Sequence, residues 1–116
     1  MIFKALNRSY LTNKAIRIYK KKKGLELTEL SLNILYTGYL LHLDNKTLTA
    51  NTIYKYMQKQ SLFYSYDNVL IWFNRFVGLS VFVPSLTKDH CFIVSSYGVS
   101  VLNSFELCLR RVRHDR

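Results

Sequence analysis

The chain has 116 residues, of which 49% are hydrophobic, and a formal net charge of +10 at pH 7. This length suits one domain with one hydrophobic core, so we expect residues 1–116 to form a single unit. The sequence lacks an apolar run of about 18 residues and the apolar core of a secretory signal, which argues against a membrane protein. A cytoplasmic location is therefore expected.

The positive charge is concentrated at the two ends of the sequence. Residues 1–23 hold eight Lys or Arg and no acid, and residues 110–116 hold four Arg against one acid. Between them, residues 24–109 hold five basic and six acidic side chains. Blocks of one charge favour contact with a polyanion, with nucleic acid first and an anionic membrane surface second. For Lys20, Lys21, Lys22 and Lys23 alone, a solvated tail is the simpler alternative.

Two helices are expected in the first 43 residues. Apolar residues recur at roughly helical spacing from Phe3 to Tyr19, which predicts an amphipathic helix with a basic outer face within residues 1–23. The stretch 27–43 is apolar nearly all round, and Thr28 stands where an N-cap is needed, so we expect a buried central helix. A membrane span is the alternative, but polar residues interrupt a stretch that is short for a bilayer.

A candidate helix-turn-helix follows. Thr49 can cap a short helix over residues 50–58, and Ser65 can cap a second helix over residues 66–77 that ends at Gly78. Two helices joined by a short connection are typical of this motif. The second helix is then the one that is presented to a binding partner.

One side of this second helix carries residues that suit contact with DNA. Val69, Phe73 and Phe76 share the side that faces a core, and Ile71 lies on the other side. Asn and Arg side chains can contact base edges and phosphates. The predicted DNA contacts are Ser65, Asn68, Trp72 and Arg75, together with Lys55 and Lys59 of the preceding helix. As alternatives, Trp72 contacts a partner protein or packs beneath the neighbouring strands.

The last third of the sequence predicts a β-hairpin and a final helix. Runs 81–83 and 92–94 are rich in β-branched residues and are separated by a turn-forming stretch. Residues 96–113 show helical spacing. The predicted fold is therefore mainly α with a small β-hairpin (α+β). Its order matches a winged helix-turn-helix, with core and wing over residues 28–95 and extra N- and C-terminal helices.

The chain resembles the multiple-antibiotic-resistance regulator (MarR) family of winged-helix proteins over about residues 28–112. Gly78-Leu79 resembles the pair that ends the recognition helix of such proteins. Val94-Ser95-Ser96-Tyr97-Gly98 resembles the Leu-Thr-x-x-Gly pattern that opens their next helix, with Ser95 in the capping position. The sequence departs from the family in two ways, because the wing tip has no arginine and the recognition helix is short.

The resemblance implies a transcriptional regulator that binds double-stranded DNA. Helix 65–77 would enter the major groove and the wing at 81–94 would place Lys88 near the minor groove. The basic residues Lys20, Lys21, Lys22 and Lys23 would contact phosphates. Proteins of this kind often bind small aromatic effectors, but core packing accounts equally well for the aromatic residues of this chain.

The resemblance also implies a homodimer, because the outer helices of that family pair two subunits. Helix 96–113 is apolar over more of its circumference than one small core requires, which fits a two-fold dimer. The predicted dimer contacts are Leu6, Tyr10, Leu102, Phe105 and Leu109. The alternative is that the two terminal helices pack on each other within a monomer.

The sequence shows no catalytic set and no glycine-rich phosphate loop. His90 and Cys91 are adjacent, but alternation along a strand would turn them to opposite faces. The two cysteines have neither zinc-site nor disulfide-framework spacing, so a metal is not expected. Because the sequence shows no catalytic set, an enzyme is not expected, nor is a cofactor. The alternative function is a winged-helix protein-interaction or assembly module of a phage or mobile element, which the nearly neutral middle of the chain favours.

Overall fold

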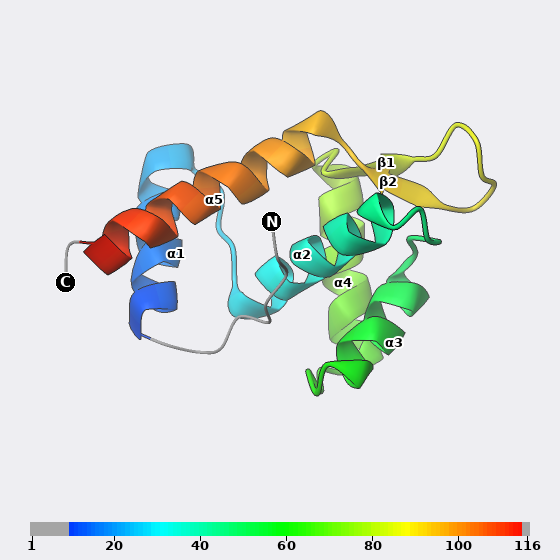
Figure 1. Ribbon diagram of the computed structural model, residues 1–116, viewed down its shortest axis with the longest axis horizontal. Coiled ribbons are helices and arrows are strands. Elements are labelled where there is room, and N and C mark those ends of the chain that lie inside the picture. Colours follow the sequence, from blue (N-terminus) through cyan, green and yellow to red (C-terminus); the bar gives the residue numbers. More distant parts are fainter. Residues whose placement is uncertain (1–9, 115–116) are drawn as a thin grey trace.

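The computed structural model describes residues 10–114, and this part of the chain is mainly helical with one small antiparallel sheet (Figure 1). The elements are α1 (Tyr10–Lys23), α2 (Glu29–Leu43), α3 (Ala50–Lys59), α4 (Tyr66–Gly78), β1 (Phe82–Pro84), β2 (Phe92–Val94) and α5 (Ser96–His114). The molecule is elongated, with extents of 45 × 28 × 24 Å, and α1 and the hairpin loop lie at opposite ends (Figure 1). The predicted α+β class is confirmed.

Helix α2 is the centre of the fold. The Thr28 hydroxyl accepts the Ser31 backbone N–H at 3.0 Å and the Ser31 hydroxyl accepts the Thr28 N–H at 2.7 Å, which makes a capping box. Residues 31–38 are all buried, because α2 contacts α3, α4, α5 and β2. The predicted buried central helix is confirmed.

The pair α3 and α4 begins at the predicted caps. Thr49 forms a second capping box with Thr52, and the Ser65 hydroxyl accepts the Asn68 backbone N–H at 3.2 Å. The predicted end of α4 is wrong by one residue. Gly78 was expected to follow the helix and terminate it, but it is the last helical residue. The backbone instead takes a positive φ of 60° at Ser80.

The hairpin pairs Phe82 with Val94, Val83 with Ile93 and Pro84 with Phe92. It lies over α2 and α4, where the Phe73 and Phe82 ring centroids are 5.2 Å apart. The Nδ1 atom of His42, near the end of α2, accepts the Val94 backbone N–H at 3.3 Å. The strand prediction is confirmed to within one residue. His90 lies outside β2 in the exposed loop, so strand alternation does not decide its orientation.

Helix α5 starts as predicted from Ser95, whose hydroxyl accepts the Gly98 backbone N–H at 3.0 Å. It then packs along α1, and the Tyr19 and Phe105 rings meet edge to face with centroids 6.1 Å apart. The lysine run forms the last turn of α1, and Gly24 follows it at a φ of 74°. The helix predicted within residues 1–23 is therefore present from Tyr10 onward, and residues 1–9 lie outside the described part.

The packing of α5 against α1 corrects the reason for which Leu102, Phe105 and Leu109 were predicted to contact a second subunit. Leu102 and Phe105 are 0% exposed and Leu109 is 6% exposed within one chain. They are not on the surface, because α1 and the core cover the wide apolar side of α5. Leu6 and the Tyr10 side chain lie outside the described residues. The homodimer itself stays a prediction.

Within residues 10–114, no helix is both long enough and apolar enough to span a bilayer.

Candidate nucleic-acid interface

The outward side of α4 is polar and weakly charged. Asp67, Ile71 and Asn74 are all exposed on it, together with the predicted residues Ser65 and Asn68. The Ser65 hydroxyl is engaged as the helix cap. The sequence analysis did not include Asp67 and Asn74 in this surface, because it placed the exposed side of the helix around Asn68, Trp72 and Arg75.

Trp72 and Arg75 form a stacked pair on that flank. The Arg75 guanidinium carbon lies 4.7 Å from the centroid of the Trp72 ring, close enough for a cation–π contact. Trp72 is half-buried beside Phe76, with ring centroids 5.8 Å apart. The tryptophan therefore packs against the core as well as the surface, while the Arg75 side chain remains exposed.

This pair borders a groove of about 790 Å³ between α4 and the connection from α1 to α2. The groove brings the end of α4 next to the segment that follows the lysine run. Its lining is mostly apolar and consists of Leu25, Glu26, Thr28, Trp72, Arg75, Gly78 and Leu79. Sequence reasoning could not find this groove, because residues 25–28 and 72–79 meet only in the folded chain.

The other predicted cations lie away from the lysine run. Lys55 and Lys59 are exposed on α3, and Lys88 is in the hairpin loop, where its Nζ donates to the Asn45 carbonyl oxygen at 3.1 Å. Lys88 and Lys46 line a pocket of about 130 Å³ at the hairpin base. The fold thus spreads the predicted DNA contacts along the molecule. The lysine run of α1 lies at one end, the hairpin loop lies at the other, and α3 and α4 lie between them (Figure 1).

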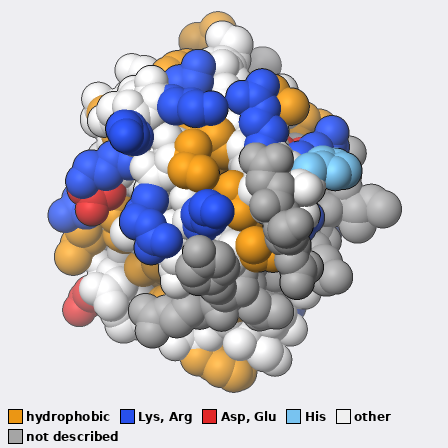
Figure 2. All heavy atoms as spheres, turned by 90° about the vertical axis from the view of Figure 1, so that its left-hand side faces the viewer, with side chains coloured by type: hydrophobic (Ala, Val, Ile, Leu, Met, Phe, Trp, Pro, Cys, Tyr) orange, Lys and Arg blue, Asp and Glu red, His pale blue; other side chains and the backbone are white. Residues whose placement is uncertain are grey.

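Helices α1 and α5 form a strongly basic end of the molecule, with cations on both sides of the helix pair, and we call this end the α1–α5 face. The two helices contain nine basic side chains and one acid, Glu106. Figure 2 looks onto this end of the molecule and shows Lys and Arg side chains spread around small apolar patches. The basic residues are Lys14, Arg17, Lys20, Lys21, Lys22, Lys23, Arg110, Arg111 and Arg113.

A small groove of about 120 Å³ runs between the two helices of this face. Lys14 and Lys22 border it from α1, and Arg111 borders it from α5. Ile18, Cys108 and Val112 line the rest, and Cys108 and Val112 are buried. The sequence analysis named Lys22 as a DNA contact but not Lys14 or Arg111. Both could have been found, because they belong to the two basic blocks at the ends of the sequence.

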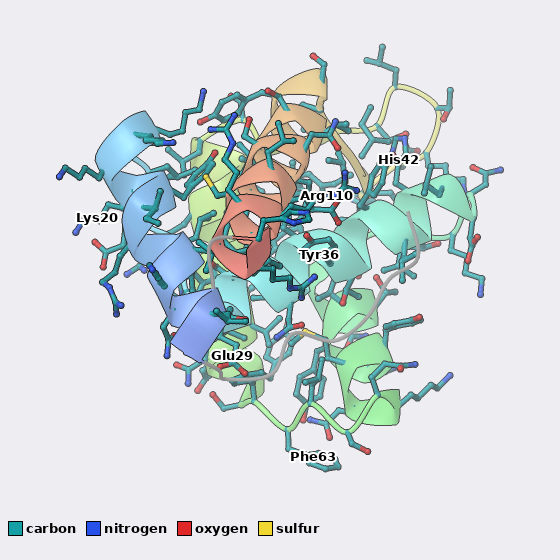
Figure 3. All side chains as sticks on the ribbon, turned by 60° about the vertical axis from the view of Figure 1, so that its left-hand side comes forward. Lys20, Glu29, Tyr36, His42, Phe63 and Arg110 are labelled. Atoms are coloured by element: carbon teal, nitrogen blue, oxygen red, sulfur yellow. The ribbon has the colours of Figure 1, made fainter. Side chains whose placement is uncertain are left out.

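The side of α5 that faces α2 has a different arrangement. The Tyr36 hydroxyl donates to Glu106 Oε1 at 3.2 Å (Figure 3 labels Tyr36). Burial raises the pKa of Tyr36 above its ordinary value, the nearby Glu106 carboxylate raises it further, and Arg113 opposes this shift. Arg110 lies on α5 and Lys20 on the outer side of α1 in the same view, so cations occupy both sides of the helix pair (Figure 3).

Comparisons with models of protein families, with curated proteins and with solved structures give no match. Among residues 10–114, no group of three or more His, Cys, Asp or Glu side chains is placed to hold a metal ion. The interpretation of the interface therefore depends on its own charge and shape.

Proposed function

We propose that the protein is a DNA-binding transcriptional regulator of the winged-helix type. In this proposal α2, α3 and α4 form the three-helix core, the β1–β2 hairpin is the wing, and α4 approaches the major groove. The order of the elements supports this arrangement, as does a hairpin that packs on α2 and α4.

The observation that carries the proposal is the charge of the α1–α5 face. Helices α1 and α5 contribute nine basic side chains to one end of the molecule, against Glu106 of α5 and Glu26, which follows α1 and pairs with Lys20. This excess creates a positive potential there. Double-stranded DNA presents one negative charge per about 1.7 Å of its axis, and basic side chains that neutralise these phosphates release condensed counterions. This release favours binding to any DNA sequence.

Sequence readout is assigned to the exposed part of α4. Asn68 and Arg75 are exposed and chemically suited to contact adenine and guanine edges, respectively. Stacking on Trp72 restricts the Arg75 guanidinium, which reduces the conformational entropy that binding would cost.

Mobility shift with DNA tests the proposal. We expect random duplex fragments to be retarded at about 50 mM salt and released as salt rises. A DNA site selected from a random pool should bind more tightly than random DNA. Arg75→Ala should weaken binding to the selected site by about 1–3 kcal/mol more than it weakens binding to random DNA. The control Lys46→Ala removes the same charge away from α4 and should affect both DNAs alike. Absence of retardation at low salt would contradict the proposal.

A second candidate function is supported by the groove beside Trp72. Its mostly apolar lining, next to the exposed side chains of Ile71 and Leu79, suits contact with another protein. In this alternative the winged helix is an assembly module. A Leu79→Lys variant tests this alternative. If it still binds DNA, the groove is not needed for DNA binding. If it loses a protein complex that the unmodified protein forms, the assembly-module function is supported.

A further inference from the structure

We infer that the groove between α1 and α5 holds phosphates of the DNA backbone and supplies most of the sequence-independent affinity. This inference rests on the proposed DNA-binding function and adds the location of the main backbone contact. It places that contact at the end of the molecule opposite the hairpin loop (Figure 1). Most of the phosphate contacts then lie outside the helix-turn-helix.

Three cations meet around one small groove. Lys14, Ile18 and Lys22 follow one another at four-residue spacing, so they share one side of α1, and Arg111 approaches from α5. No acid lines this groove in the described part of the chain. The ion pair that the described residues form on this face joins Lys20 to Glu26 at 3.0 Å and engages none of the three groove cations. Like charges held together destabilise one another, and an anion seated between them would remove this repulsion.

The apolar floor of the groove increases the effect of these charges. Cys108 and Val112 are buried and Ile18 is half-buried, so the floor is low-dielectric material. Charges beside such a surface interact more strongly with an anion than they would in open water. The groove of about 120 Å³ has room for a phosphate group.

The shape of the α1–α5 face favours DNA over a membrane surface. A helix that lies in a membrane interface projects large apolar side chains into the lipid. Here the apolar residues of the groove are recessed, and Arg17, Lys21 and Arg110 are exposed. Among the described residues of the two helices, the large apolar side chains that also project are Tyr97 and Leu107 of α5. We therefore assign the face to the phosphates of a duplex.

Two matched triple variants test the inference. The groove variant Lys14→Gln/Lys22→Gln/Arg111→Gln removes three positive charges between α1 and α5. The control Lys55→Gln/Lys59→Gln/Lys88→Gln removes the same number from the contacts predicted for α3 and the wing, so the pair compares the two locations for the main backbone contact. Affinity for a random duplex is measured against salt concentration for both, and circular dichroism checks that both remain folded. The groove variant should flatten the slope of log affinity against log salt by about 2–3, and the control by less than about 1.

The outcomes separate the two proposals. If the unmodified protein binds no duplex at low salt, the proposed function fails. If it binds and the control loses as much slope as the groove variant or more, the function stands and the groove assignment is overturned. Binding to phosphatidylserine vesicles that is lost in the groove variant, with DNA affinity unchanged, would also overturn it. Should the triple variant unfold, each single substitution is expected to flatten the slope by about 1.

Discussion

The hydrogen bond between Tyr36 and Glu106 shows how one buried polar residue joins the core to the basic helix. Tyr36 is 5% exposed, and its hydroxyl reaches from α2 to α5. A buried hydroxyl without a partner would be costly, so this bond fixes the lateral position of α5. It thereby helps to set where the arginines of α5 stand.

The raised pKa of Tyr36 predicts a loss of stability at high pH. The ordinary value is 10.0, and the folded value lies above it. Below pH 10 the Tyr36 hydroxyl keeps its proton in both the folded and the unfolded state, so its contribution to the free energy of unfolding is fully present. As pH rises above 10, the unfolded state releases its proton first, so the free energy of unfolding falls. Denaturant unfolding at several alkaline pH values should show a shallower fall in the free energy of unfolding for Tyr36→Phe than for the unmodified protein.

Single residues near helix starts were predictable from the sequence. Thr28, Thr49, Ser65 and Ser95 all act as caps, because capping depends on contacts three residues away. The position of Trp72 was not predictable in the same way. Its ring lies between core and groove, and that position is set by residues that are distant in sequence.

The junction between the hairpin and α5 is closely packed around Gly98. A Cβ atom at this position would lie 2.7 Å from Val94 Cγ1 and 2.8 Å from the Val81 carbonyl oxygen. The carbonyl belongs to the backbone and cannot move cheaply. This contact, rather than a special backbone angle, explains why a glycine follows the cap of α5.

Gly98→Ala is therefore expected to destabilise the fold by about 1–3 kcal/mol, as overpacking does in other cores. The matched control is Gly78→Ala, since a Cβ at Gly78 meets no atom within 4 Å and alanine favours the helical backbone. Thermal unfolding compares the two variants. Equal melting temperatures for both would show that the junction can relax.

The pairing of α1 with α5 is held mainly by apolar contacts. Phe105 is fully buried against Tyr19, so Phe105→Ala should cost about 3–5 kcal/mol. Leu107 on the same helix is 54% exposed, and Leu107→Ala should change stability by no more than about 0.5 kcal/mol. Chemical denaturation measures both. A small effect of Phe105→Ala would mean that α1 does not cover α5 in solution.

At the level of elements, helix and strand positions followed from local patterns, but helix partners did not. The periodicity of residues 96–113 predicted an apolar helix correctly. That its apolar side is covered by α1 of the same chain depends on how residues 24–28 turn the chain back. No local pattern determines that direction.

Across the whole molecule, the charge is distributed unequally along the long axis. Helices α1 and α5 have nine basic residues against one acid, whereas residues 44–95 have five against three. Such a field attracts DNA to one end first. The lysine run was predictable from the sequence, but the meeting of Lys14, Lys22 and Arg111 was not, because residues 14–22 and 111 are about 90 positions apart and come together only through packing.

Lysine footprinting tests the location of DNA most directly. The protein is acetylated with and without a random duplex at low salt, and mass spectrometry measures the modification of each lysine. We expect DNA to protect Lys14 and Lys22 several-fold more than Lys55 and Lys59, because phosphates seated in the α1–α5 groove cover those ammonium groups. Protection of Lys55 and Lys59 with Lys14 and Lys22 still fully modified would contradict this location.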